Sequence, residues 1–512
     1  MNKNKPGILA LLICISMLLT SCQGQVPTSD TDPATTLPPA VQKYVAPIGD
    51  AALEYTASAT LYLPRLSGFL LEAIETEAAF SAARPDAESL VRALLNQPSN
   101  KSVSAVGGNV KLSLYGVNPV EVSRNVATVN LSASALQMDR KSYFLSCQAI
   151  TNTLTELPEI DYVNFLVVDR AVGLDIANTL PMGSLSRNTE SDIGAAYEQM
   201  LLRRVDVTET AAEKSLTSTV TLYFPHAKAP GILSEVRSCT FRNQLIPDMI
   251  VTLLHELAAG SQQGIDTPAL PLLADMLSEA PKVVESEENG KLIELNFAYN
   301  LDEMLLGNHL SRSSCMASIC YTLCTFFPGI SGIRVTIGEQ PVETLMLTDH
   351  FESSVVFPNQ VQQRKDFASL LYDECTLVLP DENGEKLVEL KRPVPYYQAD
   401  NPRTELLELA KGPLAQDSLT SVMAIMPKEG IVDADIIGLA LDDGTLLVNF
   451  SAAFANESQE YDLHQEQLLA YALVNTLCQH PQVQLVHFFL SGKPFEGFSG
   501  EIFWESDFAP MY

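Results

Sequence analysis

The feature that most constrains the fold of this chain is an internal repeat. Three segments share one order of landmarks: a short apolar strand closed by proline, a second strand, a helix, a strand with an asparagine, and a helix followed by a strand. The prolines are Pro64, Pro225 and Pro380, and the asparagines are Asn130, Asn296 and Asn449. Chance could align one landmark, but several in the same order indicate three copies of one domain.

The last block of each copy predicts a helix followed by a strand. The three blocks read NTLTELPEIDYVNFLVV, YTLCTFFPGISGIRVTI and NTLCQHPQVQLVHFFLS, aligned on Thr153, Thr322 and Thr476. Apolar residues four apart, such as Ile150 and Leu154, predict one buried face on each helix. The helix ends near a proline because the ring cannot continue the helical hydrogen bonds. We therefore predict an α+β chain of three tandem related domains, each a small sheet packed by two helices.

The repeats divide the chain into seven parts. Residues 1–21 are predicted as a lipoprotein signal peptide and 22–54 as anchor and flexible tether; the domains are 55–176, 218–340 and 368–512, and the linkers are 177–217 and 341–367. AAYEQMLLRRV in the first linker predicts a short helix. The aromatic C-terminal tail, which holds Trp504, is expected to pack on the third domain or to contact a partner.

The N-terminal segment indicates export. A basic start precedes an apolar stretch from Gly7 to Leu19, which is too short to span a bilayer of about 30 Å. The stretch ends in LTSC, which resembles the lipobox of bacterial lipoproteins, and this resemblance implies that Cys22 is acylated, with palmitate or a similar chain. The alternative is an ordinary secretory signal with an incidental cysteine. The polar, proline-rich residues that follow predict a solvated tether, so we expect a lipid anchor in the cell membrane and an extracytoplasmic location.

The repeat itself resembles the GerM, or GerMN, domain of sporulation and spore-germination lipoproteins. The resemblance rests on the NQP and KGP helix ends, the VNLS and VNFS strands, and the TLTELP and TLCQHP blocks. It is weakest in the second copy, which has no proline after Gly260 and no serine after Asn296-Phe297. The resemblance implies a non-catalytic role in assembling an extracytoplasmic protein complex, although a third copy is unusual for the family.

The charge of the chain excludes some partners. It has 62 acidic and 32 basic residues, a net charge of −30, whereas a nucleic-acid-binding surface needs clustered lysine and arginine. The negative charge increases from the first repeat to the third. We hypothesise that Asp433, Asp435, Asp442 and Asp443 form a partner surface, for a basic partner or cations, on the domain farthest from the anchor.

The sequence contains no convincing catalytic, cofactor or metal site. His255-Glu256 matches the start of a metalloprotease helix, but Ala259 stands where the second histidine is needed. Seven cysteines remain once Cys14 and Cys22 are set aside: Cys147, Cys239, Cys315, Cys320, Cys324, Cys375 and Cys478. An odd number cannot be fully paired within one chain. We expect small core residues, with a disulfide or a metal cluster as alternatives.

These observations predict a non-enzymatic lipoprotein that acts as a scaffold or assembly factor in sporulation or spore germination, without a cofactor. Two alternatives stay open. One is a lipoprotein that binds an envelope polymer or a small ligand in clefts between domains. The other is an extracytoplasmic hydrolase.

Overall fold

The computed structural model describes residues 44–50, 54–81, 84–173, 180–188, 193–202, 212–347, 354–426, 431–455 and 461–511. The chain divides into two units, residues 1–45 and 46–512, and every element below belongs to the second. The predicted signal peptide and Cys22 lie outside the described residues. No helix in these ranges is long and apolar enough to cross a bilayer.

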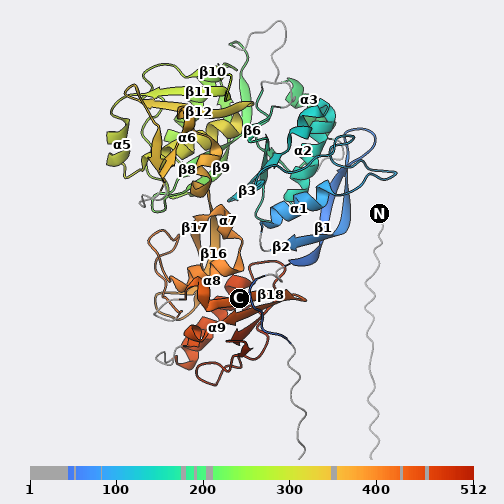
Figure 1. Cartoon of the computed structure of the whole chain (residues 1–512), viewed down its shortest axis with the longest axis vertical. Helices are drawn as coiled ribbons and strands as arrows, with labels where there is room; N and C mark the ends of the chain where they lie inside the picture. The colour runs from blue at the N-terminus through green and yellow to red at the C-terminus, as the bar shows by residue number, and fades with distance from the viewer. Residues whose placement is uncertain are drawn as a thin grey trace, which may run out of the picture. The chain divides into compact units, whose positions relative to one another are not determined.

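The fold is α+β, with several small sheets packed by helices (Figure 1). We call residues 54–173, 212–347 and 372–511 the first, second and third domains. The first contains β1 (Glu54–Pro64), β2 (Leu71–Ser81), α1 (Asp86–Leu95), β3 (Val120–Ser123), β4 (Val126–Leu131), α2 (Arg140–Leu154), β5 (Tyr162–Val167) and β6 (Arg170–Ala171). The second contains β8 (Leu216–Pro225), β9 (Ile232–Phe241), α4 (Ile246–Ala258), β10 (Lys282–Ser286), β11 (Gly290–Phe297), α5 (Leu301–Gly307), α6 (Arg312–Phe326), β12 (Ile330–Ile337), β13 (Gln340–Pro341) and β14 (Thr344–Met346).

The third domain contains β16 (Tyr372–Pro380), β17 (Leu387–Pro395), α7 (Tyr396–Ala399), α8 (Pro402–Ala410), β18 (Ile436–Asp442), β19 (Thr445–Phe450), α9 (Leu463–Leu477), β20 (Leu485–Leu490) and β21 (Lys493–Pro494). Further elements are β7 (Leu185–Ser186), α3 (Gly194–Leu202), β15 (Ser354–Val356) and the 3-10 helices η1 (Ala133–Gln137), η3 (Pro358–Gln360), η4 (Arg364–Leu370), η5 (Asp433–Asp435) and η6 (Ala452–Ala455).

Each domain repeats one topology. An antiparallel hairpin opens it, and a mixed sheet follows in the order β3-β4-β5-β6, β10-β11-β12-β13 or β18-β19-β20-β21. The middle pair of each sheet is parallel and the outer pairs are antiparallel. The long helix α2, α6 or α9 forms the crossover between the two parallel strands and contacts both the hairpin and the sheet.

The long helices α2 and α6 are buried nearly all round, whereas α9 is exposed in its first turn. In α6 every residue from Ser313 to Phe326 is buried, and in α2 every residue from Tyr143 to Leu154. The prediction of a single buried face is therefore wrong for these helices, because the hairpin covers one side and the sheet another. The predicted core residues Ile150 and Leu154 are both fully buried.

The aligned threonines join the long helix to the opening strand. The hydroxyl oxygens of Thr153, Thr322 and Thr476 accept the backbone N–H of Tyr62, Tyr223 and Val378 at 3.0, 3.1 and 2.9 Å. Each of these N–H groups lies on the outer edge of a two-stranded hairpin, where no strand partner satisfies it. The threonine is thus a structural device shared by all three domains, including the divergent second one.

The repeated asparagine ties the inner strand to the turn that follows its parallel neighbour. Asn130 donates to Asp169 at 2.6 Å and accepts its backbone N–H at 3.1 Å, and Asn449 accepts the backbone N–H of Gly492 at 3.0 Å. In the second domain Asn296 accepts the hydroxyl of Thr336 at 2.7 Å.

The segments predicted as linkers pack on the domain that precedes them. In the first, β7 pairs with β5, Ile193 is buried in the first core, and the predicted helix is present as α3. In the second, Phe357 and Phe367 are buried in the core of the second domain, together with Leu370 just beyond the predicted linker. These segments therefore complete the cores instead of only connecting them.

The aromatic tail packs on the third domain, which confirms the first of the two alternatives predicted for it. Trp504 is fully buried, and its Nε1 donates to Glu466 at 2.7 Å. Glu466 also accepts the backbone N–H groups of Phe498 and Ser499. Burial opposes ionisation of Glu466, but hydrogen bonds from the tail hold its pKa below the usual value. This carboxylate therefore fixes the tail.

Candidate functional site

The four aspartates predicted as one partner surface lie at both ends of β18. Asp433 and Asp435 precede the strand, Asp442 is its last residue, and Asp443 follows in the turn to β19. A strand of this length extends roughly 20 Å, so the structure brings the four together only as two pairs.

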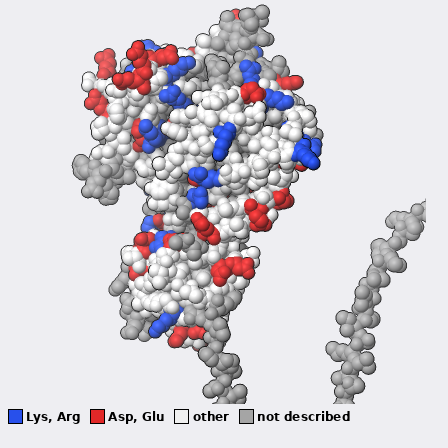
Figure 2. Space-filling view, turned by 45° about the vertical axis from the view of Figure 1, so that its right-hand side comes forward, with Lys and Arg blue, Asp and Glu red and all other residues white. Residues whose placement is uncertain are grey.

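The two pairs differ in their contacts. Asp433 pairs with Arg403 at 3.0 Å, and Asp435 accepts the hydroxyl of Ser451 at 2.7 Å. Asp442 and Asp443 are exposed. On the face in Figure 2, acidic side chains are interspersed with basic ones and with broad uncharged areas. The second pair is therefore the more accessible one.

The third domain binds Gly49 and Asp50, which lie within the segment 22–54 that the sequence predicts as a tether. The backbone N–H of Gly49 donates to Ile437 at 2.8 Å, and Asp50 pairs with Arg403 at 2.5 Å. A Cβ on Gly438 would meet the backbone nitrogen of Gly49 at 2.6 Å, so this close approach requires glycine. Residues 49 and 50, which precede the first domain in the sequence, therefore contact the third domain.

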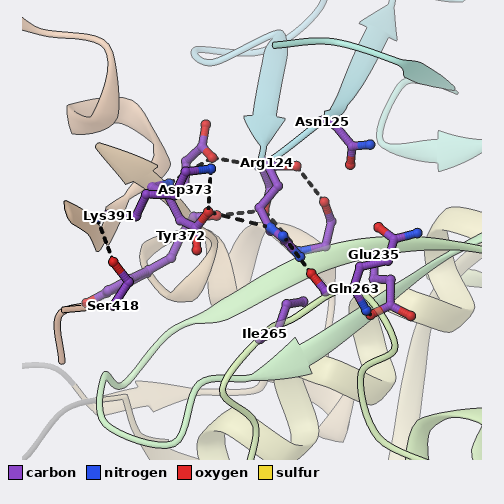
Figure 3. A network of polar contacts seen from close by, with 12 residues as sticks. Arg124, Asn125, Glu235, Gln263, Ile265, Tyr372, Asp373, Lys391 and Ser418 are labelled. Atoms are coloured by element: carbon purple, nitrogen blue, oxygen red, sulfur yellow. Dashed lines mark hydrogen bonds and ion pairs between the residues drawn. The ribbon is translucent and has the colours of Figure 1, made fainter. Parts of the chain in front are cut away.

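One tight turn of the first domain contacts both other domains (Figure 3). The Ser123 hydroxyl between β3 and β4 donates to the Tyr372 carbonyl at 2.6 Å and accepts the backbone N–H of Ser234 at 3.1 Å. The backbone N–H of Arg124 donates to Asp373 at 2.6 Å. We call Ser123 and Arg124 the junction turn.

The guanidinium of Arg124 extends this junction. Its Nη2 donates to the Gln263 carbonyl of the second domain at 3.0 Å, and its Nε lies 3.7 Å from Glu374 of the third. Arg124 has a φ of 51°, in the left-handed region that costs a residue with a side chain of order 1 kcal/mol or more. The surrounding contacts hold it there. Burial raises the pKa of the partner Asp373 to about 7.

A second contact between domains centres on Arg364 in η4. Its guanidinium pairs with Glu121 of β3 and with the hydroxyl of Thr325 in α6, and lies 4.1 Å from the ring centroid of Tyr321. The side chain is only 5% exposed. A buried arginine needs such partners, since an unpaired charge would be strongly destabilising.

A third charged cluster lies in the third domain, close to Asp86 of the first. His480 contacts Asp400 at 3.1 Å and Glu405 at 3.0 Å. Burial opposes its charge, but Glu405 and Asp400 raise the pKa of His480 well above its usual value. Burial, and then the charge of Asp400, raise the pKa of Asp86 in the first domain to about 7. Both nitrogens of His480 are thus engaged by carboxylates of its own domain.

The cysteines are core residues, as predicted. All seven that the structure describes are free thiols, and all are buried except Cys478, which is half-buried. Burial raises the pKa of Cys147, Cys239 and Cys315 to about 12. At neutral pH these groups are therefore neutral and poorly nucleophilic.

His255 and Glu256 do not form a metal site. His255 is exposed on α4, while Glu256 pairs with Arg237 at 2.8 Å. Over the described ranges, no group of three or more histidine, cysteine, aspartate or glutamate side chains is arranged to hold a metal ion.

A cavity of about 540 Å³ lies beside the Arg364 contact. Its walls come from the first domain, from η4 and from α7, and combine aromatic with polar side chains. They include Tyr115, Asn118, Asn130, Arg364, Lys365 and Tyr396.

No pattern in the sequence predicts the role of the junction residues. Ser123 and Arg124 stand in an ordinary Ser-Arg-Asn turn, and their partners Ser234 and Asp373 are far away in the sequence. Tight-turn residues between two short strands could have been predicted as a hairpin. Their role between domains could not.

The fold and these contacts define a protein of repeated hairpin–helix–sheet domains, in which the buried charged groups described above hold elements or domains together. Residues 60–172 and 376–496 match the family Germane, described as "Sporulation and spore germination". The first and third domains thus each contain a segment that matches this GerMN-domain family. The second domain lies between the matched segments.

Solved structures of GerMN domains are also matched. The tandem GerMN domains of the sporulation protein GerM from Bacillus subtilis match with 14% identity, 58% of this chain and 98% of that chain covered, and a TM-score of 0.21. The first GerMN domain of GerM matches with 24% identity, 25% and 88% coverage, and a TM-score of 0.20. A candidate lipoprotein from Clostridium perfringens matches with 19% identity, 27% and 91% coverage, and a TM-score of 0.17. The comparison with curated protein sequences found no match.

Proposed function

We propose that this chain is a non-enzymatic, lipid-anchored scaffold with three GerMN-like domains, which acts in the assembly of an extracytoplasmic complex during sporulation or spore germination. The observation that carries the proposal is the match of the first and third domains to a family described by these processes. The second domain joins them as a third copy because it has the same strand order and the same threonine contact.

The junctions between domains support a scaffold. The junction turn and Arg364 place buried charges and hydrogen bonds between domains, where breaking one partner of a pair costs about 3–5 kcal/mol. Such contacts favour a fixed arrangement of the three domains over independent motion. A fixed body can present several surfaces to other proteins at once.

Deletion of the gene in its source organism tests the role. We expect fewer heat-resistant spores or slower germination, restored by the wild-type gene. A complemented strain that carries Cys22→Ala is expected to stay defective, and labelled fatty acid is expected to enter the wild type but not this variant. Normal sporulation and germination of the deletion strain would refute the proposed role, and equal labelling would refute the anchor.

One observation favours a second function, binding of an envelope polymer. The cavity beside Arg364 combines Tyr115 and Tyr396 with amide and charged side chains, a lining typical of sites that stack and hydrogen-bond a polar ligand. Binding of soluble peptidoglycan fragments to the full chain is expected to weaken with Lys365→Ala. Lys282→Ala on exposed β10 is the matched control. Equal binding by both variants would exclude this cavity.

A further inference from the structure

A groove on the third domain lies between the start of β17 and α9. Its volume is about 510 Å³. The lining residues are Val378, Glu385, Lys386, Leu387, Val388, Glu389, His464, Gln467, Leu468, Tyr471, Asn475 and Met511. Leu468 is buried, Leu387 and Tyr471 are half-buried, and Glu385, Glu389 and Gln467 are exposed.

The surface of the first domain that is equivalent to this groove can be identified, because the first and third domains share an asparagine contact. Asn475 donates to the Met511 carbonyl at 2.7 Å and accepts its backbone N–H at 2.9 Å. Asn152 makes the same two bonds with Asn188, at 2.9 and 3.0 Å. Both asparagines directly precede the aligned threonine. In each case the long helix thus holds the segment that follows its domain.

In the first domain this place is filled by the chain itself. The backbone N–H of Ile193 donates to the Phe69 carbonyl at 2.8 Å. The Tyr197 ring in α3 lies 4.9 Å from the Phe69 ring and 5.2 Å from that of Phe144. Phe69 lies five residues after the hairpin proline, as Glu385 does in the third domain. Phe144 lies nine residues before the aligned threonine, as Gln467 does. Both counterparts line the groove.

In the second domain the place is also filled by the following segment. Leu371 pairs with Ile232 at the start of β9, and a Cβ on Gly231 would meet the Tyr372 ring at 2.2 Å. Phe367 and Leu370 of the same segment are at most 1% exposed. The position of Gly231 corresponds to Lys386 of the groove.

In the third domain the described tail reaches Asn475 through Met511, and the rest of the groove stays open among the residues that the structure describes. The apolar floor matches the surface that α3 covers on the first domain. The exposed rim differs, since Glu385 and Glu389 outnumber Lys386 and leave a net negative charge where the first domain has Phe69, Leu70 and Ala73.

We propose that this groove binds a short helix of a partner protein, which carries an aromatic side chain and is flanked by lysine or arginine. The precedent is α3, a helix that places Tyr197 on the equivalent surface. The basic flanks follow from the two rim carboxylates, which favour a cationic segment. The inference rests on the proposed scaffold function and gives the chemistry of one of its partners.

A labelled peptide with the sequence of residues 193–202, extended by two lysines at each end, tests the proposal. Its binding to the detergent-solubilised full chain is measured by fluorescence anisotropy. We expect saturable binding that is lost when the peptide tyrosine is changed to serine. Gln467→Phe copies Phe144 and is expected to tighten binding about two- to tenfold, as aromatic pairs do.

Charge variants complete the test. Glu385→Lys with Glu389→Lys is expected to weaken binding about fivefold or more at low salt, an effect that 0.5 M salt removes. Glu382→Lys, on the same hairpin but outside the groove, is the matched control. Trp504 fluorescence checks that each variant is folded.

Several outcomes would overturn the inference. These are no saturable binding, equal binding by the groove and control variants, displacement of the peptide by a peptide of residues 23–43, or self-association of the chain that the groove variants abolish. The last two would assign the groove to the tether or to a second copy. Failure here with a sporulation defect in the deletion strain refutes only the groove. Binding without such a defect refutes only the proposed function.

Discussion

Arg392 provides the sharpest test of how the third domain is stabilised. Its side chain is fully buried in β17, and its Nε and Nη2 donate to Asp417 at 2.6 and 2.8 Å. Nη1 donates to the Glu408 carbonyl at 2.5 Å, and Nη2 to the Gly412 carbonyl at 2.6 Å. The guanidinium thus closes the C-terminal end of α8, where carbonyl groups lack helical partners.

We expect Arg392→Met to destabilise the third domain by about 3–5 kcal/mol, because it leaves buried Asp417 without a cationic partner and removes one of the two cationic partners of Glu408. The exposed fractions of the Asp417 and Glu408 side chains are 0% and 7%. Methionine keeps the apolar stem, so packing loss is small. The matched control is Lys411→Met, which removes the other cationic partner of Glu408. Because the Lys411 side chain is 54% exposed, we expect this variant to lower the free energy of unfolding by less than about 1 kcal/mol.

Urea unfolding followed by Trp504 fluorescence measures the effect. The chain has a single tryptophan, buried in this core, so the signal reports on the third domain. With an m-value of about 2 kcal/mol/M, the midpoint is expected to fall by roughly 1.5–2.5 M. Adding Asp417→Asn and Glu408→Gln to Arg392→Met is expected to recover part of the loss. A midpoint for Arg392→Met no lower than that of Lys411→Met would refute the reasoning.

Three further predictions follow from single contacts. Thr476→Val removes the acceptor of the Val378 N–H and is expected to destabilise the third domain by about 1–3 kcal/mol, whereas exposed Thr420→Val is expected to be neutral in the same urea assay. The pKa of Asp373 is raised from 3.8 to about 7, so the folded chain binds more protons than the unfolded one between these values. Stability is therefore expected to fall as pH rises from about 4 to 7. In thermal melts, Asp373→Asn is expected to reduce this dependence of stability on pH, and an unchanged dependence would contradict the prediction. Cys478, the one half-buried thiol described, is expected to react first with iodoacetamide under native conditions, and mass spectrometry showing faster labelling of a buried cysteine would count against the structure.

Local patterns predicted the elements well. Hydrophobic pattern and helix-stop residues predict the proline ends of β1, β8 and β16, the strands around Asn130 and Asn449, and the helices that contain the aligned threonines. The threonine itself could be aligned from the sequence. Its role as acceptor for a strand N–H on the hairpin edge could not be predicted, because that contact joins residues about ninety positions apart.

The candidate site was predicted less well. Asp433 and Asp443 are close in sequence, but a strand separates them, and Arg403 already pairs with Asp433. Sequence proximity does not predict a cluster when the chain between the residues is extended.

The sequence by itself determined the repeat, the α+β class and the relationship to GerMN domains, since these depend on short-range periodicity and landmark order. Only the tertiary structure decided which segment covers which surface. It placed residues 46–50 on the third domain, packed the predicted linkers into the cores, and used one turn at Arg124 to contact two other domains. These outcomes depend on burial and hydrogen-bond partners contributed by distant parts of the chain, which local propensity does not encode. The same physics left a groove on the third domain that the first two domains fill with their own following segments.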